Sequence, residues 1–353
     1  MESRSTRACM VFAACLLIFF PAAVRTQASS LSVARRVRAL TGAPTRVVWC
    51  QVLDRTGKSR LMGLDTEDGR GIRVILPAVA SCVKPLITPS GQQIVFSNRP
   101  SDKVYVVNWD GSQLKSLVSG YAADVWQDPG TRKEWVYVRV GSGLRKNAIV
   151  RYRMDDPSVS ELVWDKTPVG QDAVSWFQVS RDGTHAGSAF PWPKCGVAIL
   201  PNRSWKLLGL GCWTSLAPDN SYRFFHFDGT HKEIVMYEGD GSRKRIIPLS
   251  NAPGVDNRMV LNPRWTNSAQ FMTMDAPNQN ADNAADEKKS EIYLGRFNSH
   301  FTRVSKWVRI TSNDVPDVWA SAWVKLSGSA HSRSLRAQRP AHKLVPGVQV
   351  ARR

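Results

Sequence analysis

TPSGQQIVFSNRPSDKVYVVNWDGSQLKSL, residues 88–117, is the stretch of sequence that decides the fold. A Pro-x-Gly turn leads into an apolar run at Ile94–Ser97, and a second such run follows at Val104–Asn108. An Asp-Gly turn then precedes a third run at Leu114–Val118. Short apolar runs separated by turn residues are typical of strands joined as hairpins, so we predict three consecutive antiparallel strands.

Weaker copies of the opening turn recur along the chain. They read QDPG at 127–130, SRDG at 180–183 and APDN at 217–220. Counted from Thr88, successive turns begin 39, 53 and 37 residues apart, which brackets the ~40–50 residue period of propeller blades. Degenerate blades at Thr45–Trp49 and Asn262–Trp265 bring the predicted number to six, with five or seven left open.

The repeat predicts an all-β propeller. A short four-stranded sheet with two apolar faces cannot bury both of them alone, so the blades stack around an axis and the ring closes. We expect closure where the segment Pro316–Val324 meets the first blade near Val47. An open sandwich also contains short alternating strands, but it lacks such a repeat. No long run with helical periodicity separates the strands, which disfavours a doubly wound α/β fold.

The blade at 88–117 resembles the repeat of TolB-like (WD-type) propellers, whose blades read SPDG..IAF.S.R....IY..N.DGS....LT. The resemblance extends over roughly residues 45–326 and implies about six four-stranded blades. It also implies a role as a periplasmic interaction module. TolB carries an additional N-terminal α/β domain, for which we see no convincing counterpart between Ala28 and Thr45. Resemblance of fold does not by itself transfer function.

The N-terminus reads as an export signal. A basic lead up to Arg7 precedes an apolar run from Ala8 to Phe20 and a small-residue stretch that ends at Ala28. This order predicts a signal peptide over residues 1–28, with retention as a membrane anchor as the alternative. Residues 29–44 are then a linker. We therefore expect a periplasmic or extracellular protein with no membrane span after cleavage.

The opposite end of the chain is a predicted disordered basic tail, residues 327–353. The whole chain has a net charge of +19, and the tail holds six Lys and Arg residues without one Asp or Glu. Cationic segments of this kind adhere to polyanions through salt-sensitive contacts. Most charge runs, however, are only solvated disordered chain. We predict possible polyanion contact through the tail and no specific nucleic acid.

The cysteines suggest disulfide chemistry. Two of the six, Cys9 and Cys15, lie in the predicted signal peptide. The remaining four are Cys50, Cys82, Cys195 and Cys212. An even number in an oxidising compartment favours disulfides, and no Cys-x-x-Cys spacing indicates zinc. We predict a bridge between Cys195 and Cys212, while four cysteines leave three connectivities open.

Five tryptophans occupy repeat-related positions and are the predicted ligand-binding residues. They are Trp126, Trp176, Trp213, Trp265 and Trp319. The resemblance places them where the outer strand of one blade leads into the inner strand of the next. On that face, indole rings stack on sugar rings or grip a peptide, because they combine a large contact area with one polar N–H. The alternative is that they wedge between blades as packing residues.

Metal and hydrolase signatures are weak or missing. His226 and His231 flank Asp228, but two ligands on one hairpin lack a third fixed position, so no metal is predicted. The chain has no Gly-x-Ser-x-Gly elbow and no phosphate-binding Gly-x-x-x-x-Gly-Lys run. We therefore predict no catalytic residue and no cofactor.

The sequence favours an exported, non-catalytic propeller that docks a protein partner or a cell-envelope glycan. The alternative is a carbohydrate-active hydrolase or lyase with paired acids in the funnel. The candidate acids for that alternative are Asp124, Asp128, Asp182 and Asp219. Asp182 and Asp219 lie in turns, where a carboxylate usually accepts hydrogen bonds from the local backbone.

Overall fold

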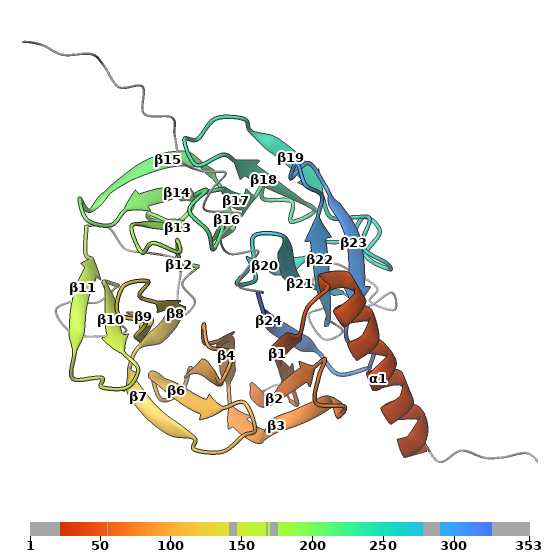
Figure 1. The fold of residues 1–353 in the computed structure, drawn as a ribbon. Helices are drawn as coiled ribbons and strands as arrows, with labels where there is room; N and C mark the ends of the chain where they lie inside the picture. Colours follow the sequence, from red (N-terminus) through yellow and green to blue (C-terminus); the bar gives the residue numbers. More distant parts are fainter. Residues whose placement is uncertain are drawn as a thin grey trace, which may run out of the picture.

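The structure, a computed structural model, describes residues 22–326 except 55, 141–146, 167–168, 170–175 and 278–289. The predicted tail and all but the last residues of the predicted signal peptide lie outside these ranges. Figure 1 shows a ring of six sheets around a central axis, with one helix on its outer side. The predicted six-bladed, all-β propeller is thus confirmed.

Each blade is a four-stranded antiparallel sheet. From the axis outward, the first blade contains β24 (Asp317–Val324), β1 (Thr45–Val52), β2 (Lys58–Asp65) and β3 (Gly71–Ala80). The second contains β4 (Cys82–Ile87), β5 (Gln93–Asn98), β6 (Lys103–Asn108) and β7 (Lys115–Ser119). The third contains β8 (Tyr121–Gln127), β9 (Glu134–Arg139), β10 (Ile149–Arg153) and β11 (Ser160–Trp164).

The other three blades repeat this order. The fourth contains β12 (Gln178–Val179), β13 (His185–Ala189), β14 (Lys194–Ile199) and β15 (Ser204–Leu210). The fifth contains β16 (Cys212–Leu216), β17 (Phe224–Phe227), β18 (Glu233–Tyr237) and β19 (Arg245–Pro248). The sixth contains β20 (Leu261–Trp265), β21 (Phe271–Pro277), β22 (Ser290–Phe297) and β23 (Val304–Arg309).

The ring closes where the sequence indicates. Strand β24, the last in the chain, pairs with β1, and Val47 lies opposite Ala322. The first blade therefore takes its inner strand from the C-terminal part of the chain and its other three from the N-terminal part. Backbone hydrogen bonds hold the two ends of the ring together, so closure adds a sheet contact rather than a covalent bond.

Strand β5 of the second blade illustrates why an apolar run suits a sheet that packs between two neighbouring blades. Along β5, Ile94 and Phe96 pack with residues of the first blade, while Val95 packs with residues of the third. All three side chains are buried. Because successive side chains of a strand point to opposite faces, a continuous apolar run is what a sheet packed on both sides requires.

A helix occupies the segment that the sequence analysis treats as a linker. Helix α1 spans Ala22–Thr41 and ends at Gly42, whose φ of +70° suits a helix C-terminus. Val33, Val37 and Leu40 are buried against the first and sixth blades. The predicted linker thus belongs to a helix that packs on the propeller. The predicted cleavage point at Ala28 falls within this helix. Among the described residues, no helix has both the length and the apolar character needed to cross a membrane.

The disulfide joins a different pair from the predicted one. Cys50 on β1 and Cys82 on β4 are bonded, with their Cα atoms 6.1 Å apart. Cys195 and Cys212 are both free. The thiol of Cys195 instead donates to the carbonyl of Gly209 at 3.2 Å. The bridge therefore links neighbouring first and second blades rather than the fourth and fifth.

Candidate functional site

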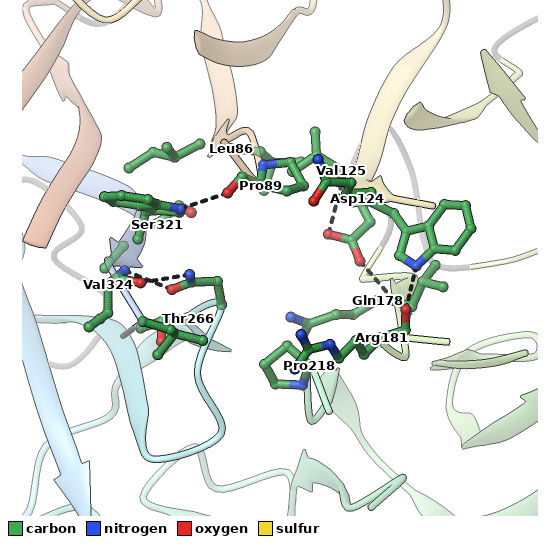
Figure 2. Close-up of a pocket in the computed structure, with 18 of the residues that line it drawn as sticks. Leu86, Pro89, Asp124, Val125, Gln178, Arg181, Pro218, Thr266, Ser321 and Val324 are labelled. Atoms are coloured by element: carbon green, nitrogen blue, oxygen red, sulfur yellow. Dashed lines mark hydrogen bonds between the residues drawn. The ribbon is translucent and has the colours of Figure 1, made fainter. Parts of the chain in front are cut away.

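A pocket of about 540 Å³ opens where the inner strands end (Figure 2). Its lining includes the last residues of four inner strands, Ile87, Gln127, Val179 and Val324, and the loops that follow the other two, at Pro218 and Thr266. All six blades thus contribute to it. Six strand ends converging on one axis produce a concave site, as is usual for ligand pockets in closed β folds.

An ion pair crosses the axis at the floor of the pocket. Arg264 on β20 donates to Asp124 on β8 at 2.5 Å, and these strands belong to the sixth and third blades, which face each other across the ring. Asp124 also accepts from the backbone N–H of Val179 at 2.7 Å and of Val125 at 2.9 Å. Burial raises the pKa of Asp124 above its ordinary value, while Arg264 acts in the opposite direction.

A buried lysine lies beside this ion pair. Lys84 on β4 has φ of +50° and donates its ammonium group to the carbonyl of Ala123 at 2.7 Å. Burial lowers the pKa of Lys84 well below its ordinary value, and the nearby Arg264 lowers it further, while Asp124 raises it. The second, third and sixth blades therefore meet in a compact charged cluster on the axis.

The rim of the pocket is basic. Arg132, Arg181 and Lys325 line it, together with one carboxylate, Asp182. Burial lowers the pKa of Arg181, and the neighbouring Arg132 lowers it further, which indicates two cations at close range. The rim thus presents more positive than negative groups to an incoming ligand.

Asp182 is held by its own turn. It accepts from the hydroxyls of Ser180 and Tyr222, both at 2.6 Å, and from the backbone of Thr184 at 3.0 Å. Burial acts to raise the pKa of Asp182, but these hydrogen bonds outweigh it and hold the pKa below the ordinary value. The other candidate acids serve turns as well, since Asp128 accepts from Gly130 and Asp219 from Ser221.

Two tryptophans of the pocket connect neighbouring blades. The indole N–H of Trp126 donates to the carbonyl of Arg181, and that of Trp323 donates to the carbonyl of Pro89, both at 2.9 Å (Figure 2). Each acceptor lies in the turn of the next blade. A Cβ atom on Gly183 or Gly91 in those turns would come within 2.6 or 2.8 Å of the indole rings. The glycines of the repeated turn therefore make room for an indole.

A guanidinium approaches one face of each of these two indoles. The guanidinium of Arg151 lies 5.2 Å from the ring centroid of Trp126, and that of Arg46 lies 6.0 Å from Trp323. Trp126 is only 8% exposed. Their packing between blades is the alternative that the sequence analysis kept open for tryptophans at repeat positions.

The predicted binding tryptophans do not share one face. Trp126 and Trp265 lie at the ends of inner strands β8 and β20, whereas Trp213 and Trp319 lie near the starts of β16 and β24. Trp265 is a core residue, 1% exposed. Trp176 precedes β12, and its ring contacts that of Trp213 edge-on at 5.7 Å. Of the five, only Trp126 lines the pocket.

Sequence reasoning missed Trp323, Arg264 and Arg181. Trp319 and Trp126 both occur in an Asp-Val-Trp triplet, which makes them look equivalent in the sequence. The structure instead places Trp323 in the position equivalent to Trp126, one residue before the end of its inner strand. Counting back from the end of each inner strand aligns Trp323 with Trp126. No local signal identifies Arg264, because its partner lies 140 residues away in the sequence.

The two histidines considered for a metal site are packing residues. His226 is 3% exposed, and its ring bonds the carbonyl of Phe227 at 2.7 Å. His231 lies edge-on to Trp213, with its Nε2 3.0 Å from the thiol of Cys212. Among the residues that the structure describes, no three His, Cys, Asp or Glu side chains gather as metal ligands.

Comparisons with known proteins identify the fold. No protein-family profile matches the sequence, and no curated protein matches it. The fold is similar to that of TolB from Acinetobacter baumannii, with a TM-score of 0.56 and 14% identity over 86% of this chain and 73% of that one.

Two further solved structures support the same assignment. A structure described as TolB from Agrobacterium tumefaciens gives a TM-score of 0.50 and 12% identity, covering 81% of this chain and 99% of that one. A chain of the nidogen–laminin complex gives 0.52 and 10%, covering 80% and 99%. The chain is a TolB-like six-bladed β-propeller.

Proposed function

We propose that this chain is an exported, non-catalytic binding module whose pocket docks an acidic segment of a protein partner. The observation that carries the proposal is the pocket itself: a basic rim above a floor whose Arg264 and Asp124 already neutralise each other. The rim has three cations, Arg132, Arg181 and Lys325, and one carboxylate, Asp182, so its net charge attracts an acidic ligand. Opposite charge across an interface steers association and fixes orientation more than it adds affinity.

The rim is also built to stay in place. The side chain of Asn267 donates to the carbonyl of Val324 at 2.9 Å and accepts from its N–H at 2.7 Å. The indoles of Trp126 and Trp323 fasten two of the turns. A site that needs little ordering loses less free energy on binding, and such pre-organisation favours a docking role.

A protein segment suits this pocket better than a glycan. Sugar recognition by tryptophan uses an open face of the indole, but Trp126 is only 8% exposed, and a guanidinium approaches one face of each indole, Arg151 at Trp126 and Arg46 at Trp323. What remains for a ligand is a mixture of cations, amides and aliphatic side chains such as Val125 and Leu326. That mixture matches an extended polypeptide with carboxylates. TolB-like propellers as a fold commonly mediate protein binding.

Both carboxylates of the pocket are engaged by the protein, which favours binding over hydrolysis. Burial raises the pKa of Asp124, but its Oδ1 already accepts from Arg264 and Val125 and its Oδ2 from Val179. Asp182 is held by a turn and the hydroxyl of Tyr222. A general acid needs a proton at the working pH, but the hydrogen bonds to Asp182 favour its ionised form. This arrangement argues against the carbohydrate-active alternative.

Export and polyanion contact belong to the same proposal. The buried Cys50–Cys82 bridge fits an oxidising compartment, and the N-terminal sequence fits a signal peptide. Leu326 lines the pocket and directly precedes the basic tail. The tail has the same sign of charge as the pocket rim, and we propose that it adds salt-sensitive contacts to a strongly acidic partner.

Site-specific photo-cross-linking in the native host tests the proposal. A benzoylphenylalanine at Leu326, which lines the pocket and is 43% exposed, is expected to give light-dependent protein adducts. The same probe at Leu114, 49% exposed and outside the pocket, is the matched control. Adducts that disappear in the Arg132→Glu/Arg181→Glu variant support the proposal. Identical adducts from both positions, or none from Leu326, would contradict it.

A further inference from the structure

The outermost strands of the six blades differ in how their free edges are protected. A sheet edge presents unpaired N–H and C=O groups, and natural proteins protect such edges with charges, proline, shortness or a covering element. Strands β3 and β23 contact helix α1. Strand β19 has four residues and ends in Pro248. The exposed residues of β7 and β11 include Lys115, Ser116, Ser160 and Glu161.

Strand β15 carries one such protection, the exposed Lys206, but unlike the other edges it also exposes two leucines. Leu207 is 50% exposed and Leu210 is 62% exposed, which is the largest exposure among the described large apolar side chains. Trp192, in the loop before β14, is 47% exposed. It lies close to Leu210, because Leu210 pairs with Lys194 and the N–H of Gly211 donates to the carbonyl of Pro193. The edge thus combines free backbone groups with an apolar strip.

The surroundings of β15 are basic. Lys194 and Lys206 are exposed, and the ammonium group of Lys206 donates to the carbonyl of Asp240 at 2.7 Å. That bond places the turn before β19 against β15 and brings the exposed Arg243 and Lys244 nearby, together with one exposed carboxylate, Asp240, which the surrounding cations outnumber. Between residues 176 and 210 the sequence has one carboxylate, Asp182, which belongs to the pocket instead.

We propose that β15 is a second interaction site, which accepts an extended segment of a partner protein as an added strand. Backbone hydrogen bonds to an edge strand supply affinity in this mode, and alternate side chains supply specificity. The apolar strip with its basic margin calls for a segment in which apolar and acidic residues alternate. The chain's own tail has the wrong charge, since its six charged residues are all basic. A second copy would bring Lys194 and Lys206 against their own kind.

Selection from a displayed library of random 12-residue peptides, with the full chain as bait, tests this inference. The bait for counter-selection is Leu207→Glu/Leu210→Glu, which leaves the buried face of β15 unchanged. Leu114→Glu, at an equally exposed leucine on another blade, is the matched control. Thermal melting of both variants establishes that they fold.

We expect enriched peptides with alternating apolar and acidic residues. They should bind the double variant at least about tenfold more weakly than the native chain, because two leucines lose their contacts. Affinity for Leu114→Glu and for the pocket variant Arg132→Glu/Arg181→Glu should be unchanged, which separates this site from the proposed pocket function. Hydrogen exchange should show protection of the amides of Ser204–Leu210 by the bound peptide.

Three results would overturn the inference. Enriched peptides that bind the double variant as tightly as the native chain would place the site elsewhere. Peptides that leave the β15 amides unprotected would exclude strand addition. Sedimentation that shows a dimer of the native chain and a monomer of the double variant would assign the edge to a second copy of this chain instead.

Discussion

The two ends of the propeller axis differ in the charged side chains that gather there. At the end where the inner strands finish, Arg132, Arg181 and Lys325 surround the pocket. At the end where they start, Asp275, Glu291 and Asp317 are buried at the junction of the sixth and first blades. The cations at the first end line an open pocket, whereas these three acids at the other end are buried. The difference indicates that one end recognises and the other assembles the ring.

The acids at the starting end are tied into the closure of the ring. Asp317 at the start of β24 accepts from the indole of Trp49 on β1 at 2.7 Å and from Asn313 at 2.7 Å. Asp275 on β21 accepts from the N–H of Trp319 at 2.8 Å and from the amide of Asn262 at 2.6 Å. Burial raises the pKa of Asp317 to about 6 and that of Asp275 to about 7.

Breaking the ion pair across the axis should have the largest effect. Arg264→Met removes the cation that is hydrogen-bonded to the buried Asp124 and leaves only Lys84 nearby, whose pKa burial lowers. Breaking a buried ion pair typically costs about 3–5 kcal/mol of unfolding free energy. Urea unfolding followed by tryptophan fluorescence measures the loss. Adding Asp124→Asn in the same chain removes the orphaned charge and should recover much of it. An Arg264→Met variant as stable as the native chain would show that the ion pair between Arg264 and Asp124 does not stabilise the fold.

Neutralising Asp275, at the end where the inner strands start, should have the next largest effect, and it should raise the unfolding free energy. The pKa of Asp275 in the folded protein is about 7, above the ordinary 3.8, because burial disfavours its charge. The folded state therefore holds an extra proton in this window, and stability falls as the pH rises from about 4 to about 7. Asp275→Asn should raise the unfolding free energy at pH 8 by on the order of 2–4 kcal/mol.

The control for that substitution is the pH itself. At pH 4 the aspartic acid is already neutral in the folded protein, so Asp275→Asn should change stability little there. Melting temperatures of the native chain and of the variant, recorded from pH 4 to pH 8, give the effect of the substitution at low and at high pH in one series. A variant that is equally destabilised at every pH would mean that asparagine does not fit the site and that the charge is not the cause.

The two cysteine pairs sharpen the comparison at the starting end. Cys50→Ala/Cys82→Ala removes the bridge between the first and second blades and should lower the unfolding free energy by about 2–4 kcal/mol. Cys195→Ala/Cys212→Ala breaks no bond, so it should cost less. Urea unfolding under non-reducing conditions compares them. Free-thiol titration of the native chain should find Cys195 and Cys212 reactive after unfolding, and finding them bonded would contradict the structure.

A smaller effect is expected at the pocket end from Trp323→Phe. The substitution keeps the ring between blades but removes the N–H that donates to the carbonyl of Pro89, which is worth about 1 kcal/mol. Trp109→Phe is the matched control, because the buried indole N–H of Trp109 has no hydrogen-bond acceptor. Chemical unfolding should find the control less destabilised, and the reverse order would argue against the indole connection.

The sequence was sufficient for features that local pattern controls. The blade at 88–117, the ring closure at Val47 and the carboxylates of the turns all follow from short-range turn chemistry and apolar runs. Helix α1 was not predicted, because its first residues carry the small-residue pattern of a cleavage site. Its docking depends on Val33, Val37 and Leu40 meeting a surface that exists only after the ring has closed.

The candidate site could be predicted only in outline. Contacts that define it join distant residues, as Arg264 and Asp124 do across 140 positions. The same limit applies to the disulfide, since the fold brings together cysteines 32 residues apart that the sequence does not rank above the other pairs. The tryptophans illustrate a third limit: Trp319 shares a triplet with Trp126 in the sequence, whereas distance from the strand end aligns Trp323 with Trp126.

The most direct test of the central claim is the affinity of the cross-linked partner's segment for the two ends of the propeller axis. Arg132→Glu/Arg181→Glu, at the pocket, should weaken binding at least about tenfold, because two attractive contacts become repulsive. Arg99→Glu/Lys103→Glu makes the same charge change in the β5–β6 hairpin, at the end where β4 starts. Unchanged affinity there and a loss at the pocket would support the account. Equal losses at both ends, or none at the pocket, would contradict it.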